Sequence, residues 1–375
     1  MTLFTRAFPK LAAPLCVMIG LAACAERPGA LSLHPTEVST QVGTPVKVLM
    51  ATTRKRSDAD AQDFTNQRAF SLSYEHYTVS VPPGHVVGKV ELADQPPGDP
   101  TRNFVVTNAG PLSEAGFNAA LSAGKNSGDV VVFVHGYNTN YQEAVFRLAQ
   151  LNYDSGSHAA FIGFAWPSRG TMAGYLADRE SSTYSRDYFE DLLNDLAHNP
   201  NVKRINILAH SMGNWLVAET LRQAKLRGKS PFLPKLSEVF MMSPDIDIDV
   251  FRSELDVIGK LNEPITVGIS RDDRALAVSQ RLAGDVPRVG NVLVDNPREQ
   301  AAIARYGLRI LDMSDTAGPD SFNHSKFVDL LPSLREIART DYAPEGDPVS
   351  RTGTFVVETG GKILQAPMRQ VVLGQ

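Results

Sequence analysis

The chain has 375 residues, of which 43% are hydrophobic and 21% are charged, so it is long enough to bury a sizeable core. Its formal net charge of -4 and its pI of about 6.1 indicate no strongly basic surface, and we expect no nucleic acid among its partners. The composition is typical of one large α/β domain, or of one such domain with a small annex.

The first 23 residues have the pattern of a secretory signal peptide. Arg6 and Lys10 precede the apolar run "LAAPLCVMIGLAA", which is too short for a membrane-spanning helix. The run ends in "LAAC", which resembles the lipobox of bacterial lipoproteins, and this predicts a lipid on Cys24. The alternative is an ordinary signal with a chance cysteine. By the same resemblance, Ala25 favours an outer-membrane anchor in the cell envelope, facing the periplasm, so a membrane is one expected partner.

The two cysteines divide the N-terminal region from the domain. Cys16 would leave with the signal peptide (residues 1–23) and Cys24 would carry acyl groups, so the mature domain would have no disulfide and would depend on its core. Residues 24–45, rich in Pro, Thr, Ser and Gly, are expected to form a flexible tether. We place the domain at residues 46–342 and a Gly- and Pro-rich tail, with "TFVVET" as a candidate edge strand, at residues 343–375.

Short alternating or apolar runs open the domain. "VKVLMAT", "YTVSVP", "GKVEL" and "NFVVTN" are expected to be antiparallel strands, because the turn signals "PPG" and "PPGD" lie between them. The charge run "TRKRSD" at residues 53–58 is interpreted as a solvated loop.

From residue 111 onward, helices and strands alternate. Apolar runs predict strands at residues 129–136, 159–167, 202–210, 237–244, 264–270 and 307–314. Amphipathic segments predict helices at residues 112–124, 141–153, 185–199, 214–226, 249–261, 274–284 and 324–339. Strands that are apolar on both faces and alternate with helices predict a mostly parallel sheet with helices on both faces. The antiparallel strands would lie at its N-terminal edge.

The segment "INILAHSMGNWLVAETL" places Ser211 where a buried strand meets a helix. Ala209 and Gly213 flank it at a distance of two residues, as in the nucleophile elbow of serine hydrolases. The turn is so sharp that side chains at these two positions are crowded, and small residues relieve the crowding. The alternative, that Ser211 is only a helix N-cap, explains neither the small neighbours nor the preceding strand.

Ser211 needs a general base, and His324 in "SFNHSKF" has the expected position. It follows a late strand and begins a predicted helix, in the chain order serine, acid, histidine. The alternative is a capping or surface histidine. Seven other histidines are excluded because they precede the parallel region, belong to the turns themselves or come before a strand: His34, His76, His85, His135, His158, His198 and His210.

The acid of the site has two candidates. Asp273, in "ITVGISRDDRAL", is preferred because hydrolases more often use the later strand, and Asp245, in "MMSPDIDIDVF", is the alternative. A carboxylate there would fix the tautomer of the histidine and stabilise its charged form. The rejected acids would serve as helix N-caps.

"VFVHGYNTN" supplies a candidate oxyanion hole. The backbone amides of Tyr137 and Met212 would hold the negative charge of a tetrahedral intermediate, and Gly136 would allow close approach. A plain turn at the strand end is the alternative. No group of Cys or His residues has the spacing of a metal site, and we expect neither a metal nor another cofactor.

Together, "FVHGYN", "AHSMGNWL", "SPDIDIDVF", "SRDDRAL" and "NHS" resemble a bacterial branch of the α/β-hydrolases, described as esterase/lipase-like or as a domain of unknown function. The resemblance covers about residues 46–340. It implies an α/β-hydrolase fold and a Ser-Asp-His triad that cleaves carboxylic esters of small molecules or lipids through an acyl-enzyme. Acyl transfer to another alcohol, or a non-catalytic binding or scaffold module on the same fold, are the alternatives. The oligomeric state does not follow from the sequence.

Overall fold

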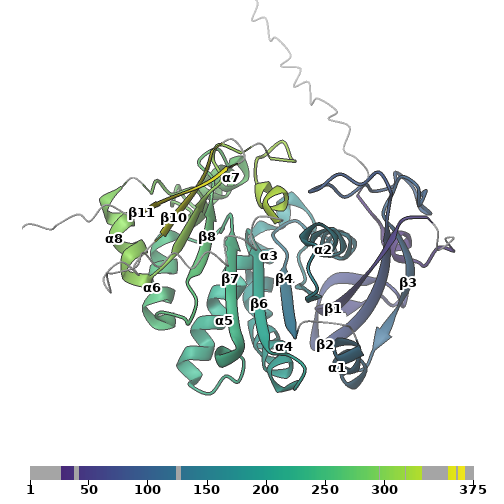
Figure 1. The fold of residues 1–375 in the computed structure, drawn as a ribbon. Coiled ribbons are helices and arrows are strands. Elements are labelled where there is room, and N and C mark those ends of the chain that lie inside the picture. Colours follow the sequence, from purple (N-terminus) through teal and green to yellow (C-terminus); the bar gives the residue numbers. More distant parts are fainter. Residues whose placement is uncertain are drawn as a thin grey trace, which may run out of the picture.

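The computed structural model describes residues 27–37, 42–123, 128–294, 296–316, 318–331, 354–359 and 362–367, the last two segments by their backbone alone. The described residues form one eleven-stranded sheet in the order β11-β10-β9-β8-β7-β6-β4-β5-β1-β2-β3 (Figure 1). Cys24 and the predicted signal peptide lie outside the described residues.

The sheet is mostly parallel, as predicted. Every adjacent pair from β10 to β1 is parallel, so these strands end at one common edge, the upper edge in Figure 1. These strands are β1 Thr44–Arg56, β4 Asp129–Val134, β5 Ala160–Ala165, β6 Arg204–His210, β7 Leu236–Met242, β8 Ile265–Ile269, β9 Arg309–Asp312 and β10 Thr354–Thr359.

The N-terminal edge is antiparallel, also as predicted, but it contains one strand fewer than expected. β2 Phe64–Val81 pairs with β1, and β3 Val105–Leu112 pairs with β2. The run "GKVEL" forms no strand. The amide of Gly88 donates to Asp154 Oδ2 (2.8 Å) and His85 lies between Glu91 and Asp154, so this loop is held by side chains of a neighbouring helix instead of by a strand.

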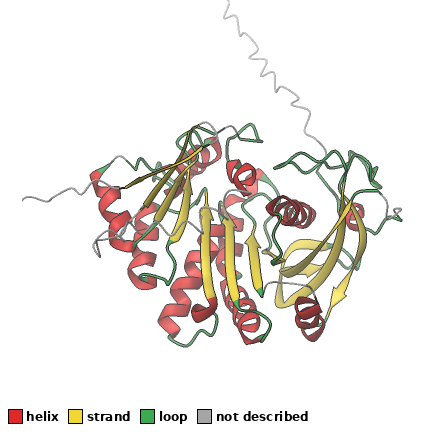
Figure 2. Ribbon diagram, viewed as in Figure 1, coloured by secondary structure: helices red, strands yellow, loops and turns green. Residues whose placement is uncertain are grey.

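Helices cover both faces of the sheet (Figure 2). Their bounds are α1 Glu114–Ala123, α2 Tyr141–Ser155, α3 Tyr175–Tyr184, α4 Arg186–His198, α5 Gly213–Arg227, α6 Ile248–Ile258, α7 Arg274–Leu282 and α8 Pro297–Tyr306, with short 3-10 turns η1 Ala30–Leu33, η2 Met172–Gly174, η3 Leu233–Lys235, η4 Val289–Asn291 and η5 Lys326–Leu330. The sequence predicted six of the eight α-helices. It missed α3 and α8, which bury few apolar side chains, so their amphipathic pattern is weak.

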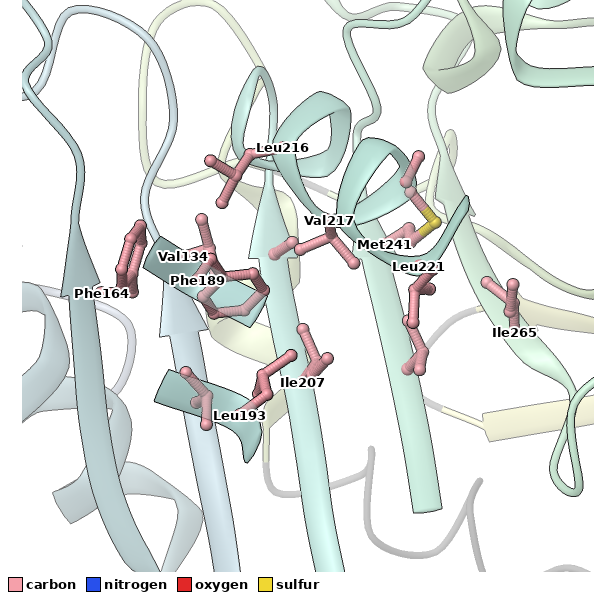
Figure 3. Close-up of a cluster of buried hydrophobic side chains, with 14 of the residues drawn as sticks. Val134, Phe164, Phe189, Leu193, Ile207, Leu216, Val217, Leu221, Met241 and Ile265 are labelled. Carbon is pink, nitrogen blue, oxygen red and sulfur yellow. The ribbon is translucent and has the colours of Figure 1, made fainter. Parts of the chain in front are cut away.

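Two hydrophobic cores lie on opposite faces of the sheet, because successive strand residues point to opposite sides. On β4, Val132 and Val134 enter the core beneath α4, α5 and α6, whereas Phe133 enters the core beneath α2. Figure 3 shows the first core, where Phe189 of α4 and Leu216 of α5 lie over the strands. These fully buried strands hold the turns at the upper edge in place.

Both ends of the domain differ from the predicted boundaries. Residues 27–37, expected to belong to the flexible tether, pack on the domain: Leu33 is fully buried. "TFVVET" is β10, but it is not the edge strand, because β11 Lys362–Pro367 pairs outside it, and both strands of the predicted tail belong to the sheet. The helix predicted at residues 324–339 begins as the 3-10 turn η5, and residues 332–339 lie outside the described residues.

Among the described residues, no helix combines the length and apolar character needed to cross a membrane.

Candidate active site

Ser211 lies in a strained turn between β6 and α5. Its φ of 53° is in the left-handed region, which non-glycine residues rarely adopt. The Ser211 amide donates to the Met242 carbonyl (3.0 Å), and the Asn214 side chain donates to the carbonyls of Ser211 (3.0 Å) and Met242 (2.8 Å). The Ser211 hydroxyl has no hydrogen-bond partner among the described residues. The backbone of this turn is therefore fixed while the hydroxyl is left free.

The residues on either side of Ser211 are small for a geometric reason. A Cβ atom at Gly213 would lie 2.5 Å from the His135 carbonyl oxygen and 2.7 Å from that of Val134, so no larger residue fits without a backbone shift. Ala209 is fully buried, and its single methyl group fits in the core beneath α5. This crowding agrees with the predicted elbow.

His324 and Asp273, far apart in the chain, are hydrogen-bonded. The Nδ1–H of His324 donates to Asp273 Oδ2 (2.7 Å), which leaves Nε2 of the ring as the free base. The other oxygen, Oδ1, accepts from the Leu276 amide (2.9 Å) and caps α7. Asp273 thus takes two roles that were expected of different acids, that of helix cap and that of partner of the histidine.

The loop that carries His324 is held by two further carboxylates. Asp320 accepts hydrogen bonds from the amides of Phe322, His324 and Ser325. Burial alone would raise the pKa of Asp320, but these three donors lower it below its ordinary value.

A buried lysine fixes the same loop from below. The Nζ of Lys326 is fully buried and donates to Asp272 Oδ1 (2.6 Å) and to the carbonyls of Met313 (3.0 Å) and Ser314 (3.1 Å). Asp272 also accepts from the Asn323 side chain (2.7 Å). Lys326 was not identified from the sequence, although a lysine between the candidate histidine and the apolar run "FVDLL" was an available signal.

The neighbour of Ser211 contacts His324 directly. Nε2 of His210 donates to the His324 carbonyl oxygen (3.1 Å), and the two rings lie 4.6 Å apart. Ser243 Oγ donates to the same carbonyl (3.2 Å). Burial and the nearby His324 lower the pKa of His210 well below its ordinary value, so this ring is a neutral spacer. The elbow and the histidine loop are therefore joined through His210.

The surroundings of His324 favour its charged form. Burial lowers its pKa, but the hydrogen bond and charge of Asp273, with the charges of Asp245 and Asp320, outweigh burial and raise the pKa above the ordinary 6.5. A histidine that is stabilised as imidazolium suits a residue that accepts a proton during a reaction.

Asp245, the alternative acid, does not bind His324. It accepts hydrogen bonds from Tyr175 Oη (3.1 Å) and from Ser279 Oγ, and Arg288 Nε lies 3.3 Å from it. Asp245 and Arg288 are 5% and 3% exposed, so they form a buried ion pair. The structure therefore pairs His324 with Asp273, the preferred acid. Asp245, the alternative, acts on His324 only through its negative charge.

The loop with the candidate oxyanion donors packs directly on the elbow. A Cβ atom at Gly136 would lie 2.9 Å from the Cβ of Ser211, so only glycine allows this approach. The amides of Tyr137 and Met212 donate to no other described residue. Beneath the loop, His135 stacks on fully buried Trp166 with ring centroids 4.8 Å apart. Burial and the Arg54 charge lower the pKa of His135 to about 3, so His135 is a neutral support.

Arg54, within the charge run that was interpreted as a solvated loop, is 2% exposed at the end of β1. It donates to the carbonyls of Thr139 (2.8 Å) and Ser168 (3.1 Å) and so joins the oxyanion loop to the loop after β5. Asp178 of α3 accepts from the Asn138 amide (3.3 Å) and from Ser168 Oγ (2.6 Å). The interpretation of "TRKRSD" as a solvated loop was wrong for residues 53–56, because they continue β1 and both Thr53 and Arg54 are buried.

In the described part of the chain, no group of three or more His, Cys, Asp or Glu side chains has the geometry to hold a metal ion.

The family model described as "Alpha/beta hydrolase of unknown function (DUF900)" matches residues 113–338, which is more than half of the chain and includes the elbow, Asp273 and His324. An uncharacterized protein of Nostoc sp. (strain PCC 7120) is 38% identical over 65 residues, and the match spans 17% of this chain and 17% of that relative.

Solved structures similar to this chain include an esterase of Pyrobaculum calidifontis, with 14% identity and a TM-score of 0.33 over 56% of this chain and 78% of that one. A hydrolase of Oleispira antarctica has 10% identity and a TM-score of 0.26 over 58% and 93% of the two chains. A lipase-esterase related protein of Clostridium acetobutylicum has 12% identity and a TM-score of 0.24 over 57% and 93%.

Proposed function

The chain belongs to the α/β-hydrolase family of unknown function whose model it matches, and we propose that it is a serine esterase with Ser211, His324 and Asp273 as its triad. The observation that carries the proposal is the hydrogen bond between His324 and Asp273, on a loop that touches the strained Ser211 turn through His210. Carboxylic esters, including lipid esters, are the proposed substrates.

In the proposed mechanism, Ser211 Oγ attacks the acyl carbonyl carbon and its proton passes to Nε2 of His324. Asp273 holds the ring in this tautomer and stabilises the imidazolium. The amides of Tyr137 and Met212 hold the tetrahedral oxyanion, where each donor is typically worth about 10²–10³ in rate. His324 then protonates the leaving alcohol, and water hydrolyses the acyl-enzyme by the reverse sequence of proton transfers.

Labelling with a fluorophosphonate tests the nucleophile. We expect the wild-type protein to be labelled and Ser211→Ala to lose both labelling and ester hydrolysis, by about 10⁶ in kcat where a nucleophile is removed. Ser230→Ala is the control, because Ser230 is also a buried serine but its hydroxyl donates to Glu190 Oε1 (2.9 Å), away from the Ser211 turn. We expect it to keep its labelling.

Equal labelling of wild type and Ser211→Ala, or none of either, would contradict the proposal and favour a binding or scaffold module. Where labelling follows the expected pattern, product analysis with added alcohols separates hydrolysis from acyl transfer.

We also propose that Cys24 carries a lipid that anchors the protein to the outer membrane, facing the periplasm. The support is the sequence "LAAC" after a short apolar run and the following Ala25. Mass spectrometry of the purified N-terminal peptide tests this. An unmodified Cys24 thiol, or a chain that still begins at Met1, would contradict it.

A further inference from the structure

The first described residue of the chain is clamped beside the candidate active site. Arg27 donates from Nε to Glu143 Oε1 (2.7 Å), and its other nitrogens donate to the side chain and carbonyl of Asn138 and to the Gly170 carbonyl. Asn138 directly follows Tyr137, the candidate oxyanion donor. A pair of hydrogen bonds between guanidinium and carboxylate fixes orientation as well as distance, so this clamp sets where the N-terminal segment leaves the domain.

The position of the clamp limits the position of the proposed anchor. Cys24 precedes Arg27 by three residues. Because an extended chain spans at most about 3.3–3.6 Å per residue, the Cα atom of Cys24 lies within about 11 Å of that of Arg27 in any conformation. A lipid on Cys24 would therefore enter its membrane next to the loop that carries Tyr137.

Two exposed apolar side chains lie on the segment that contacts Tyr137 of this loop. Met172 is 66% exposed and Leu176 is 73% exposed. The Met172 carbonyl accepts from Tyr137 Oη, and Tyr175, the neighbour of Leu176, packs edge-to-face on the Tyr137 ring at 5.4 Å.

The other side of the site has a similar rim. Phe322, two residues before His324, is 45% exposed. Val278 (41%) and Leu282 (62%) lie one turn apart on α7, next to Ser279, whose hydroxyl lies 2.8 Å from Tyr175 Oη. These side chains lie on the segments that carry Asp273, His324 and Tyr175, and a contiguous exposed apolar patch is typical of a surface that contacts a partner or a membrane.

We propose that the upper edge of the sheet, with Ser211 and His324, faces the phospholipid bilayer that holds the anchor, and that Met172 and Leu176 enter its interface. The occupant is a bilayer because the proposed lipid on Cys24 would place one within reach of these exposed apolar side chains. The inference rests on the proposed esterase function for its substrate class, which is the ester of a membrane lipid. Amphipathic helices that lie in a membrane interface bury their apolar face by about 5–10 Å, to the boundary between headgroups and acyl chains, where the ester carbonyls of phospholipids lie.

A fluorophore at Met172 tests the orientation. Full-length Met172→Cys and Lys229→Cys proteins would carry an environment-sensitive label and be reconstituted in phosphatidylethanolamine–phosphatidylglycerol vesicles with or without a doxyl-labelled lipid. Lys229 is an exposed residue just after α5, at the opposite edge of the sheet. We expect quenching at residue 172 to exceed that at residue 229 several-fold. Equal quenching, or stronger quenching at residue 229, would overturn the orientation.

Wild-type protein without an added cysteine gives the labelling background. Strong labelling of wild type would mean that a native thiol is free, which contradicts the anchor and with it the proposal. The quenching experiment is also run with the double variant Met172→Cys/Ser211→Ala. Because docking needs no catalysis, this protein is expected to quench as Met172→Cys does, so failure of the esterase proposal and failure of the docking proposal give different results.

A matched pair of variants tests the clamp. Arg27→Ala should reduce quenching at residue 172 several-fold, since the anchor segment is then free to swing. Arg204→Ala removes an equivalent two-point pair with Asp129 (2.8 and 2.6 Å) at the opposite edge and should leave quenching unchanged. Equal effects of the two substitutions would contradict the role of Arg27.

A longer segment between Cys24 and Arg27 tests whether the orientation of the site matters for hydrolysis of membrane lipids. A flexible Gly-Ser insertion of about 20 residues between Cys24 and Arg27 would add a root-mean-square reach of about 25 Å without altering any described residue. We expect hydrolysis of vesicle phospholipid to fall at least several-fold and hydrolysis of a short water-soluble ester to stay constant. If neither activity fell, the short segment between Cys24 and Arg27 would not be what orients the site.

Discussion

The loops after β7 and β8 each place a buried carboxylate at the same edge of the sheet, but the two side chains have different partners. Asp273 after β8 accepts from His324 Nδ1 and from an amide of α7. Asp245 after β7 accepts from Tyr175 and Ser279 and lies against Arg288. The two side chains are 2% and 5% exposed, so burial does not separate them. The identity of the group that faces each carboxylate decides what the carboxylate can do.

The comparison also separates chemistry from stability. Asp273 faces a ring whose other nitrogen is free to take a proton. Asp245 faces a guanidinium that always stays charged, so its negative charge compensates a buried positive one. Removing the first should change a rate, and removing the second should change the free energy of unfolding.

The largest expected effect on rate within this comparison comes from Asp273→Asn. Because Asn also caps helices well, α7 should keep its N-terminus, but the amide no longer holds His324 in the required tautomer. We expect kcat for a soluble ester to fall by about 10⁴ with little change in the melting temperature. Steady-state kinetics and thermal unfolding of the same preparation measure both quantities.

Asp245→Asn provides the counterpart to that experiment. If Asp245→Asn lowered kcat more than Asp273→Asn, the observed pairing with His324 would not be the functional one, and Asp245 would take its place in the triad.

The next effect is the loss of stability in Asp245→Asn. This change leaves the Arg288 guanidinium buried without its charge partner, which typically costs about 3–5 kcal/mol. We expect a clear drop in the free energy of unfolding in urea, while kcat of the folded fraction stays within about tenfold. The double variant Asp245→Asn/Arg288→Met removes both charges and should recover part of the loss. A double variant less stable than Asp245→Asn would contradict this account.

The sequence predicted the elements that build this edge because their signals are local. A buried strand, a small residue, a serine and an amphipathic helix are contiguous in the chain, so Ser211 was identified with its turn. The parallel order followed from the alternation of strands and helices. The strand expected at "GKVEL" was wrong because tertiary contacts, from Asp154 of α2 to Gly88, override its apolar pattern.

The rest of the site depends on contacts between distant segments. The choice between Asp245 and Asp273 was left open, because both follow parallel strands and only the path of the loop from residue 320 to 326 brings His324 to one of them. Arg54 and Tyr175 were missed for the same reason: each acts through residues more than 60 positions away. Cys24 and its lipid remain a prediction.

The smallest effect, and the most specific to the comparison, is a shift in pH dependence. In the proposed mechanism Ser211 is activated only when His324 is neutral, so the rate of fluorophosphonate labelling should fall as the pH drops through the pKa of His324. The pKa of His324 lies above the ordinary 6.5, because the effects of Asp273, Asp245 and Asp320 outweigh that of burial. The acid limb of the pH profile, where the labelling rate falls with falling pH, should therefore also lie above 6.5. Asp245→Asn removes one of these charges and keeps the Asp273 hydrogen bond, so its acid limb should move to lower pH.

Asp273→Asn should move the limb further in the same direction, because both the hydrogen bond and the larger charge effect are lost. The pH dependence of folding stability runs in the opposite direction to that of the labelling rate. Because the pKa of His324 is raised in the folded state, His324 stabilises the fold at pH values below its unfolded pKa, and this contribution is lost as the pH rises through its folded pKa. The measurement is the second-order labelling rate of the three proteins across the range in which histidine titrates. An acid limb at the same pH in Asp245→Asn as in wild type would mean that the charge of Asp245 does not change the pKa of His324. The loops after β7 and β8 would then be independent in function as well as in contacts.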